Sequence, residues 1–144
     1  MARSPVVVSL LQQGEAAAAA EDTRGLRQIA DSLEALGQLS ADDRQVLGHL
    51  RSMLGGLYAA RRQEAEAIAA WDAAVAADPD QINAAYNAGQ AAYTQGDFLG
   101  ARRRWEAALT RAPDDLDLHR KVVQACFALG DGEAGEAALA ALKA

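Results

Sequence analysis

Two stretches of this chain repeat each other at a spacing of 34 residues. Small, aromatic and helix-ending residues recur in the same order: Gly55, Ala67, Trp71, Ala74 and Pro79 are matched by Gly89, Ala101, Trp105, Ala108 and Pro113. The alanine matches carry little weight in so alanine-rich a sequence. The sequence holds only two Trp and three Pro, however, and both Trp and two of the Pro fall on this spacing. The chain is therefore a repeat protein.

The period and the residue types resemble the tetratricopeptide repeat, a helix-turn-helix unit with the pattern W-x2-L-G-x2-Y, then A-x3-F, then P. The first unit matches that pattern at Leu54, Gly55, Tyr58, Ala67, Trp71 (in place of Phe) and Pro79. The second unit keeps Gly89, Ala101, Trp105 and Pro113, but has Ala85, Ala88 and Ala92 where the first helix usually carries large residues. The resemblance implies an all-α fold, a right-handed α-solenoid of helix-turn-helix hairpins with about eight helices.

A third unit is weaker. A further offset of 34 residues aligns Tyr93 with Phe127, and Gly96-Asp97 with Gly130-Asp131, which are similar or identical residue types. It also aligns Trp105 with Leu139, Gly89 with Val123 and Ala101 with Gly135, where the residue type changes. We interpret residues 116–144 as a degenerate terminal repeat.

The residue types also predict hairpins on physical grounds. Small residues such as Gly55 and Gly89 let two helices approach closely, and Trp71 and Trp105 fill the wider gaps. Gly96 and Gly130 suit the left-handed conformation that ends a helix, and Asp97 and Asp131 suit the cap of the next helix. Pro79 and Pro113 close each unit, because proline cannot continue a helix.

The first third of the chain does not share the 34-residue register. Apolar spacing predicts helices at 5–20 and 22–36, the second ended by Gly37. Ser40 with Asp43 three residues later resembles a capping box that starts a helix near Ala41. We expect an irregular amino-terminal hairpin that covers the first repeat.

The predicted organisation is a single domain over residues 1–144. It comprises an irregular hairpin at 1–39, a first repeat at 40–81, a second at 82–115 and the degenerate third at 116–144. A hydrophobic content of 51% comes largely from alanine, as closely stacked helices require. The alternative fold is a different α-hairpin array, which the paired Trp and Pro spacing disfavours.

Charge and composition exclude several functions. A net charge of −6 argues against nucleic acid as a partner. The Arg102-Arg103-Arg104 run is interpreted as a solvated face rather than a binding patch. The Val6–Leu11 stretch is too short to cross a membrane and makes a poor signal peptide. We expect a soluble, cytoplasmic protein without direct membrane insertion. A periplasmic or membrane-anchored location stays open if the chain is part of a longer protein.

No catalytic or metal-binding arrangement is predicted. Cys126, the single cysteine, is interpreted as a buried structural thiol, since no neighbouring base is evident. His49 and His119 lack metal-ligand spacing, and the aspartates at 114, 115 and 117 are expected to stabilise a helix start. We expect neither an enzyme nor a cofactor.

The expected function is protein interaction. Helical-hairpin solenoids offer a concave groove that suits an extended segment or a helix of a partner. By resemblance to the family, first-helix residues off the packing positions line that groove. The predicted partner-binding residues are Asn83, Tyr86, Asn87, Gln90, Tyr93, Arg120, Lys121, Gln124 and Phe127. Their amides can pair with a peptide backbone, and Arg120 and Lys121 favour an acidic or carboxy-terminal segment.

Two interpretations stay open. One subset of the family binds the terminal carboxylate of chaperones through a clamp of lysine, asparagine and arginine side chains. In this chain only Asn87 and Lys121 occupy comparable positions, so a role as a partner of chaperones is disfavoured. An adaptor that binds a partner's peptide or helix is the first interpretation. A self-associating scaffold, dimeric or larger, is the second, because the last helix, at about 131–142, carries more apolar residues than one neighbouring hairpin can cover.

Overall fold

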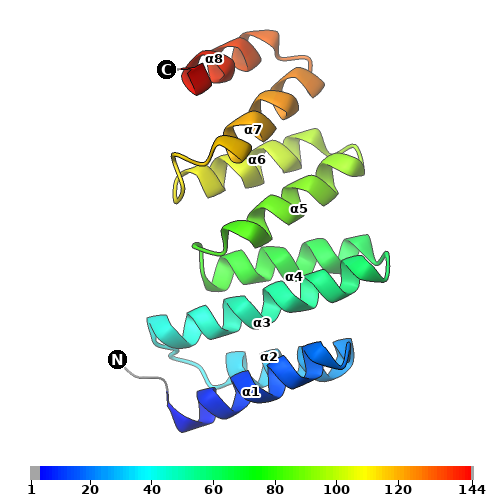
Figure 1. Ribbon diagram of the computed structural model, residues 1–144, viewed down its shortest axis with the longest axis vertical. Helices are drawn as coiled ribbons and strands as arrows, with labels where there is room; N and C mark the ends of the chain where they lie inside the picture. The colour runs from blue at the N-terminus through cyan, green and yellow to red at the C-terminus, as the bar shows by residue number, and fades with distance from the viewer. Residues whose placement is uncertain (1–3, 144) are drawn as a thin grey trace. The chain divides into compact units, whose positions relative to one another are not determined.

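The computed structural model describes residues 4–143; the extreme ends of the predicted amino-terminal hairpin and of the third repeat lie outside this range. The described chain consists of helices joined by short turns, and no strand occurs between residues 4 and 143 (Figure 1). The eight helices are α1 (Pro5–Ala19), α2 (Thr23–Ala35), α3 (Ala41–Ala60), α4 (Glu64–Ala77), α5 (Ile82–Thr94), α6 (Phe98–Leu109), α7 (Leu116–Ala128) and α8 (Gly132–Lys143). The predicted all-α class and the number of helices are confirmed.

Contacts divide the chain into two compact units, residues 1–84 and 85–144. The division falls within α5. The predicted single domain and its repeat boundaries at 40–81, 82–115 and 116–144 stay a prediction.

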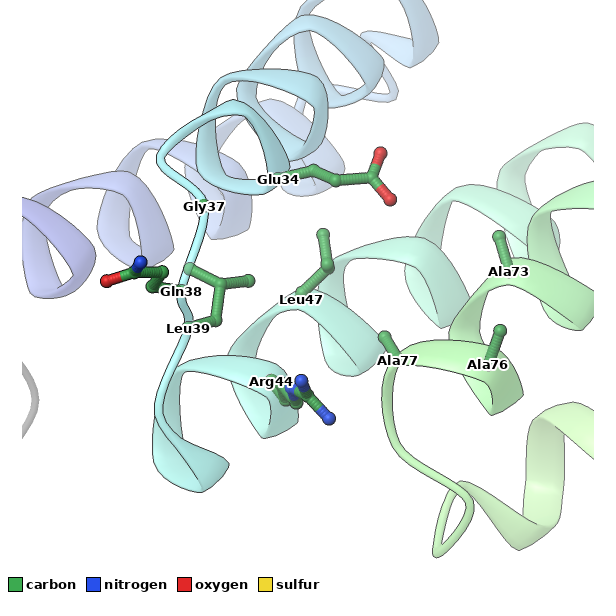
Figure 2. Close-up of a pocket in the computed structure, with 9 residues that line it drawn as sticks. All are labelled: Glu34, Gly37, Gln38, Leu39, Arg44, Leu47, Ala73, Ala76 and Ala77. Carbon is green, nitrogen blue, oxygen red and sulfur yellow. The ribbon is translucent and has the colours of Figure 1, made fainter.

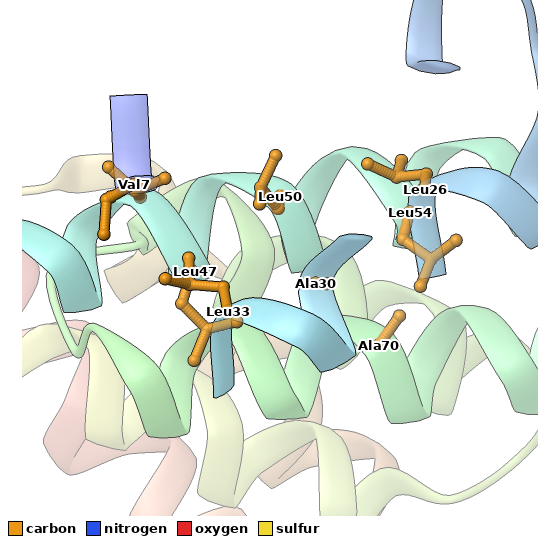
Figure 3. Packing of buried hydrophobic residues seen from close by; sticks show 9 residues of the cluster. Val7, Leu26, Ala30, Leu33, Leu47, Leu50, Leu54 and Ala70 are labelled. Atoms are coloured by element: carbon orange, nitrogen blue, oxygen red, sulfur yellow. The ribbon is translucent and has the colours of Figure 1, made fainter. Parts of the chain in front are cut away.

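In the first unit, α1 and α2 pack on each other and both pack on α3, which pairs with α4. Figure 3 shows the side chains at their centre. This core comprises Val7, Leu26, Ala30, Leu33, Val46, Leu47, Leu50, Leu54 and Ala70. Gly14 lets α1 come close to α3, because a Cβ at that position would overlap the side chain of Leu50.

Three helices begin at the caps that the sequence predicts. The Ser40 hydroxyl accepts a hydrogen bond from the Asp43 amide at 3.1 Å, and the Asp43 carboxylate accepts one from the Ser40 amide at 3.4 Å, which completes a capping box. Asp97 caps α6 by accepting from the Gly100 amide, and Asp131 accepts from the Ala134 amide at the start of α8. These side chains satisfy backbone donors that a helix start leaves free.

The hairpin turns share one backbone conformation. At the α5–α6 turn, in the second unit, Gly96 has φ 87°, its amide donates to the Tyr93 carbonyl, and the Asp97 amide donates to the Ala92 carbonyl. This is the Schellman pattern that ends a helix. The predicted left-handed conformation of Gly96 and Gly130 (φ 75°) is confirmed.

Two turns reach that conformation without glycine. Arg62 (φ 59°) joins α3 to α4, and Glu21 (φ 55°) joins α1 to α2, each with the same pair of backbone hydrogen bonds. The amino-terminal hairpin therefore uses the turn of the later hairpins, although its sequence lacks their register and offers no glycine there.

Glycine and tryptophan pair as expected in two hairpins. A Cβ on Gly55 would overlap the indole of Trp71, and a Cβ on Gly89 would overlap that of Trp105. Trp71 is 6% exposed and Trp105 is fully buried. In the α7–α8 hairpin the sizes are exchanged, because Gly135 of the second helix lies against the ring of Phe127 of the first.

Candidate functional site

The predicted binding residues lie on α5 and α7. Asn83 is exposed on the first turn of α5 and falls in the first unit, so it is considered apart. The others belong to the second unit and are here called the α5–α7 face: Tyr86, Asn87, Gln90, Tyr93, Arg120, Lys121, Gln124 and Phe127. On α5, Tyr86, Gln90 and Tyr93 are spaced by four and three residues and so share one side of the helix.

Within this face, the side chain of Lys121 on α7 contacts residues of α5 and α6. Its Nζ donates a hydrogen bond to Oε1 of Gln90 at 2.7 Å. The same Nζ lies 5.7 Å from the ring centroid of Tyr86 and 5.8 Å from that of Trp105, so two aromatic faces attract the ammonium group. Lys121 forms no ion pair with any carboxylate that the structure describes. Its charge is held in place but not neutralised.

The two tyrosines differ in their surroundings. Tyr93 packs its ring against Phe98, with centroids 4.8 Å apart, and against Trp105, with centroids 6.0 Å apart. The indole Nε1 of Trp105 donates to the backbone carbonyl of Tyr86 at 3.1 Å, which fixes the indole against α5. Both tyrosines are half-buried. Tyr93 therefore contributes to packing as well as to the surface.

Arg120, unlike Lys121, does not contact the side chains of α5. Its guanidinium lies 3.5 Å from the Asp117 carboxylate on the same helix, and both side chains are well exposed. Only Lys121 of the two predicted cations contacts α5 side chains. An exposed pair three residues apart in a helix is weak, so Arg120 can still exchange Asp117 for another anion.

Three further residues of the face are exposed to solvent. Asn87 and Gln124 are exposed, and neither side chain is hydrogen-bonded within residues 4–143. Phe127 is 45% exposed even though one part of its ring lies against Gly135. The face thus combines free amide groups, an exposed ring and one fixed cation.

The structure also places the other residues that the sequence analysis considered as possible functional groups. Cys126 is buried, as the sequence predicts. Arg102 pairs with Glu106 at 3.3 Å and lies 3.8 Å from the Asp131 carboxylate, whereas Arg103 is exposed on α6. His119 hydrogen-bonds the Pro113 carbonyl at 2.7 Å. Within the described range, no group of three or more His, Cys, Asp or Glu side chains is placed to hold a metal ion.

Sequence reasoning missed a pocket in the first unit. It has a volume of about 320 Å³ and lies among the end of α2, the loop to α3, the start of α3 and the end of α4 (Figure 2). Its lining comprises Glu34, Gly37, Gln38, Leu39, Arg44, Leu47, Ala73, Ala76 and Ala77. Three alanines within five residues of α4 are the one sequence signal for it, because small side chains leave space beside a helix.

The architecture defines a class of protein. Helical hairpins with this turn and this glycine–tryptophan packing form an all-α, solenoid-like fold of the tetratricopeptide type.

Solved structures of MamA share that fold. One crystal structure of MamA aligns with a TM-score of 0.65 at 17% identity, over 94% of this chain and 75% of that one. The RS-1 MamA ArsTM double mutant aligns with a TM-score of 0.68 at 16% identity, over 98% of this chain and 75% of that one. A structure of AMB-1 MamA gives 0.60 at 17% identity, over 97% and 98%. At such identities the similarity shows the fold alone.

Comparison by sequence adds no family: no model of a protein family matches the chain, and no curated protein matches it. Among the described residues, none of the helices is both long enough and apolar enough to cross a membrane.

Proposed function

We propose that this chain is a non-enzymatic interaction module, an adaptor whose α5–α7 face binds a segment of a partner protein that carries a carboxylate. One observation carries the proposal. The Lys121 ammonium group is fixed by Gln90, Tyr86 and Trp105, yet no described carboxylate neutralises it.

The geometry of Lys121 supports binding of an anion. A free lysine side chain loses considerable rotamer freedom when it binds a ligand, whereas Lys121 is already held in one position. Its hydrogen bond to Gln90 uses one of three ammonium protons, so two donors remain for a carboxylate. Because the side chain is half-buried, its charge is less screened than that of a fully exposed lysine.

The neighbouring residues suit the rest of a peptide. Asn87 and Gln124 each offer an amide that can both donate to and accept from a peptide backbone. The exposed part of Phe127 provides apolar area at a low cost in conformational entropy. A short acidic segment, or a carboxyl terminus with an apolar neighbour, satisfies all of these groups together.

The test compares matched variants. A partner isolated from the source cell by affinity capture is titrated calorimetrically against three proteins: the unchanged chain, the double variant Tyr86→Ala with Lys121→Glu, and Arg103→Glu as the control on α6. We expect the double variant to lose binding and the control to retain it. The reverse outcome would assign binding to the arginine run and would overturn the proposal.

Self-association is the second candidate function. Of the apolar residues of α8, Ala137, Ala140 and Ala141 are exposed, and Ala134, Ala138, Leu139 and Leu142 are only half-buried. A second copy could cover this side of the helix. Light scattering of the unchanged protein and of Ala137→Glu tests this: a dimer that the substitution disrupts supports self-association, and a monomer at every concentration contradicts it.

A further inference from the structure

The pocket of the first unit has the features of a docking site, separate from the α5–α7 face. Leu47 is buried at its base, and Leu39 and Ala77 are half-buried beside it. Glu34, Gln38, Arg44, Ala73 and Ala76 form an exposed rim. Apolar atoms at the base and polar groups at the rim are the arrangement found where one protein anchors a side chain in another.

The two charged residues of the rim are not equivalent. Glu34 is paired, because Nη2 of Arg51 lies 2.9 Å from its Oε2 and also 2.9 Å from Oδ1 of Asp31. Arg44 is exposed and forms no ion pair with any residue between 4 and 143. Figure 2 shows Glu34 and Arg44 on opposite sides of Leu47. The pocket therefore presents a free cation on one side of its apolar base and a neutralised carboxylate on the other.

The loop explains why this space is open. Gly37 (φ 65°) and Gln38 (φ 46°) both adopt left-handed conformations, which take the chain away from the end of α2 before α3 begins. The residues of α4 that face the space are all alanines. Leu36, next to Gly37 in the chain, is 52% exposed, so apolar surface continues outside the pocket.

We infer that this pocket binds a protein segment in which an aliphatic side chain is followed directly by an acidic residue. The aliphatic side chain covers Leu47 and Leu39, and the acidic carboxylate accepts hydrogen bonds from the Arg44 guanidinium, whose planar fork matches a carboxylate. Glu34 sets the direction of the segment, because its carboxylate, although paired with Arg51, can still accept a hydrogen bond from a backbone amide of the ligand.

A macromolecular ligand fits better than a free small molecule. Sites for small molecules bury most of the ligand surface, whereas six of the nine lining residues here are exposed, namely Glu34, Gly37, Gln38, Arg44, Ala73 and Ala76. A ligand that fills so open a pocket needs further contacts outside it, and the exposed Leu36 provides an apolar place for them.

The experiment is a nuclear magnetic resonance titration with three blocked dipeptides: acetyl-Leu-Glu-amide, acetyl-Leu-Gln-amide, which lacks the charge, and acetyl-Ala-Glu-amide, which lacks the anchor. We expect acetyl-Leu-Glu-amide to shift the signals of Leu39, Leu47, Ala73 and Ala77 with a Kd on the order of 1 mM, since so small a probe makes few contacts. The other two dipeptides should bind more weakly.

Variants test the assignment. Arg44→Gln should weaken acetyl-Leu-Glu-amide about two- to five-fold, the range for an exposed ion pair, and should leave acetyl-Leu-Gln-amide unchanged. Arg27→Gln, which changes an exposed arginine on α2 outside the pocket, should have no effect. Ala73→Phe, which fills the pocket from an exposed position, should abolish binding while the circular dichroism spectrum stays the same.

Several outcomes would overturn the inference. The first is that acetyl-Leu-Glu-amide causes no signal shift at concentrations well above the expected Kd. The second is that the shifts persist in Ala73→Phe. The third is that they disappear in Lys121→Gln, which would assign the binding to the α5–α7 face. Pocket signals that change with the concentration of the protein alone would show that a second copy is the occupant, and the proposed partner segment would then be wrong.

Discussion

Arg62 adopts the same left-handed backbone conformation as Gly96, which lies 34 residues later in the chain. Each residue follows the first helix of a hairpin, and each turn has the same two backbone hydrogen bonds. The difference is energetic, because the Cβ of a non-glycine residue in this region approaches the following carbonyl oxygen. The first unit therefore carries local strain at a place where the second unit has none.

Arg62→Gly should stabilise the protein by about 1 kcal/mol, the usual cost of the left-handed conformation reduced by the greater freedom of glycine in the unfolded chain. The side chain of Arg62 is exposed and makes no hydrogen bond or ion pair with the described residues, so its removal costs little. Chemical denaturation measures the change. Arg103→Gly, within α6, is the control and should destabilise by about 1 kcal/mol. A lower midpoint for Arg62→Gly would contradict the assignment of strain.

Trp71 and Trp105 fill equivalent gaps but differ in hydrogen bonding. Replacing either with Ala should cost about 3–5 kcal/mol, the typical value for a buried tryptophan. Only the indole of Trp105 donates to a carbonyl, that of Tyr86. Trp105→Phe should therefore cost about 0.5–1.5 kcal/mol more than Trp71→Phe, the net value of one hydrogen bond.

Thermal and denaturant unfolding of the four single variants measures these differences. Because the chain divides into two units, fluorescence and circular dichroism are recorded together, so that separate transitions are detected. Midpoints that barely move in both alanine variants would remove the packing role of the two tryptophans. Equal costs for the two phenylalanine variants would show that the Trp105 hydrogen bond contributes nothing.

The parts of the fold that are set by neighbours in sequence were predictable. The capping box of Ser40 and Asp43 and the turn at Gly96 depend on residue types at a short spacing, and the glycine–tryptophan pairs were found through the 34-residue repeat. The positive φ of Glu21 and of Arg62 was not predicted, since nothing in their side chains favours it. Their conformation follows from the packing of the helices on either side.

The candidate site was predictable in outline only. Helical spacing placed Tyr86 and Gln90 on one side of α5, but the position of Lys121 over two aromatic rings depends on how α7 packs beside them. The pairing of Asp117 with Arg120 was not predicted, and it explains why Arg120 does not accompany Lys121. The pocket around Leu47 could not be foreseen, because three separate elements enclose it.

Arg51 bridges α2 and α3 by contacting both Asp31 and Glu34 at 2.9 Å, and its side chain is 11% exposed. The two carboxylates are more than half exposed, which weakens the attraction. Arg51→Leu should therefore destabilise by less than about 1 kcal/mol. The neighbouring Leu50 is fully buried, and Leu50→Ala should cost about 2–5 kcal/mol. A larger effect of Arg51→Leu than of Leu50→Ala in urea denaturation would show that the bridge, and not the apolar core, holds the amino-terminal hairpin.

The fixed charge of Lys121 should be detectable through Trp105, since Nζ lies 5.8 Å from the indole centroid. In a Trp71→Phe background, Trp105 is the single source of tryptophan emission. The probe acetyl-Asp-Glu-amide should change that emission as its carboxylates approach the ammonium group. Binding should weaken as salt rises, because ions screen the attraction over about 10 Å at 0.1 M ionic strength.

Two substitutions decide whether Lys121 is responsible. Lys121→Gln keeps a hydrogen-bond donor but removes the charge, and it should abolish both the emission change and its dependence on salt. Arg103→Gln removes a charge from the exposed surface of α6 and should leave both intact. An emission change that survives Lys121→Gln but disappears with Arg103→Gln would place the anion on the arginine run, and the α5–α7 face would then have no role in binding it.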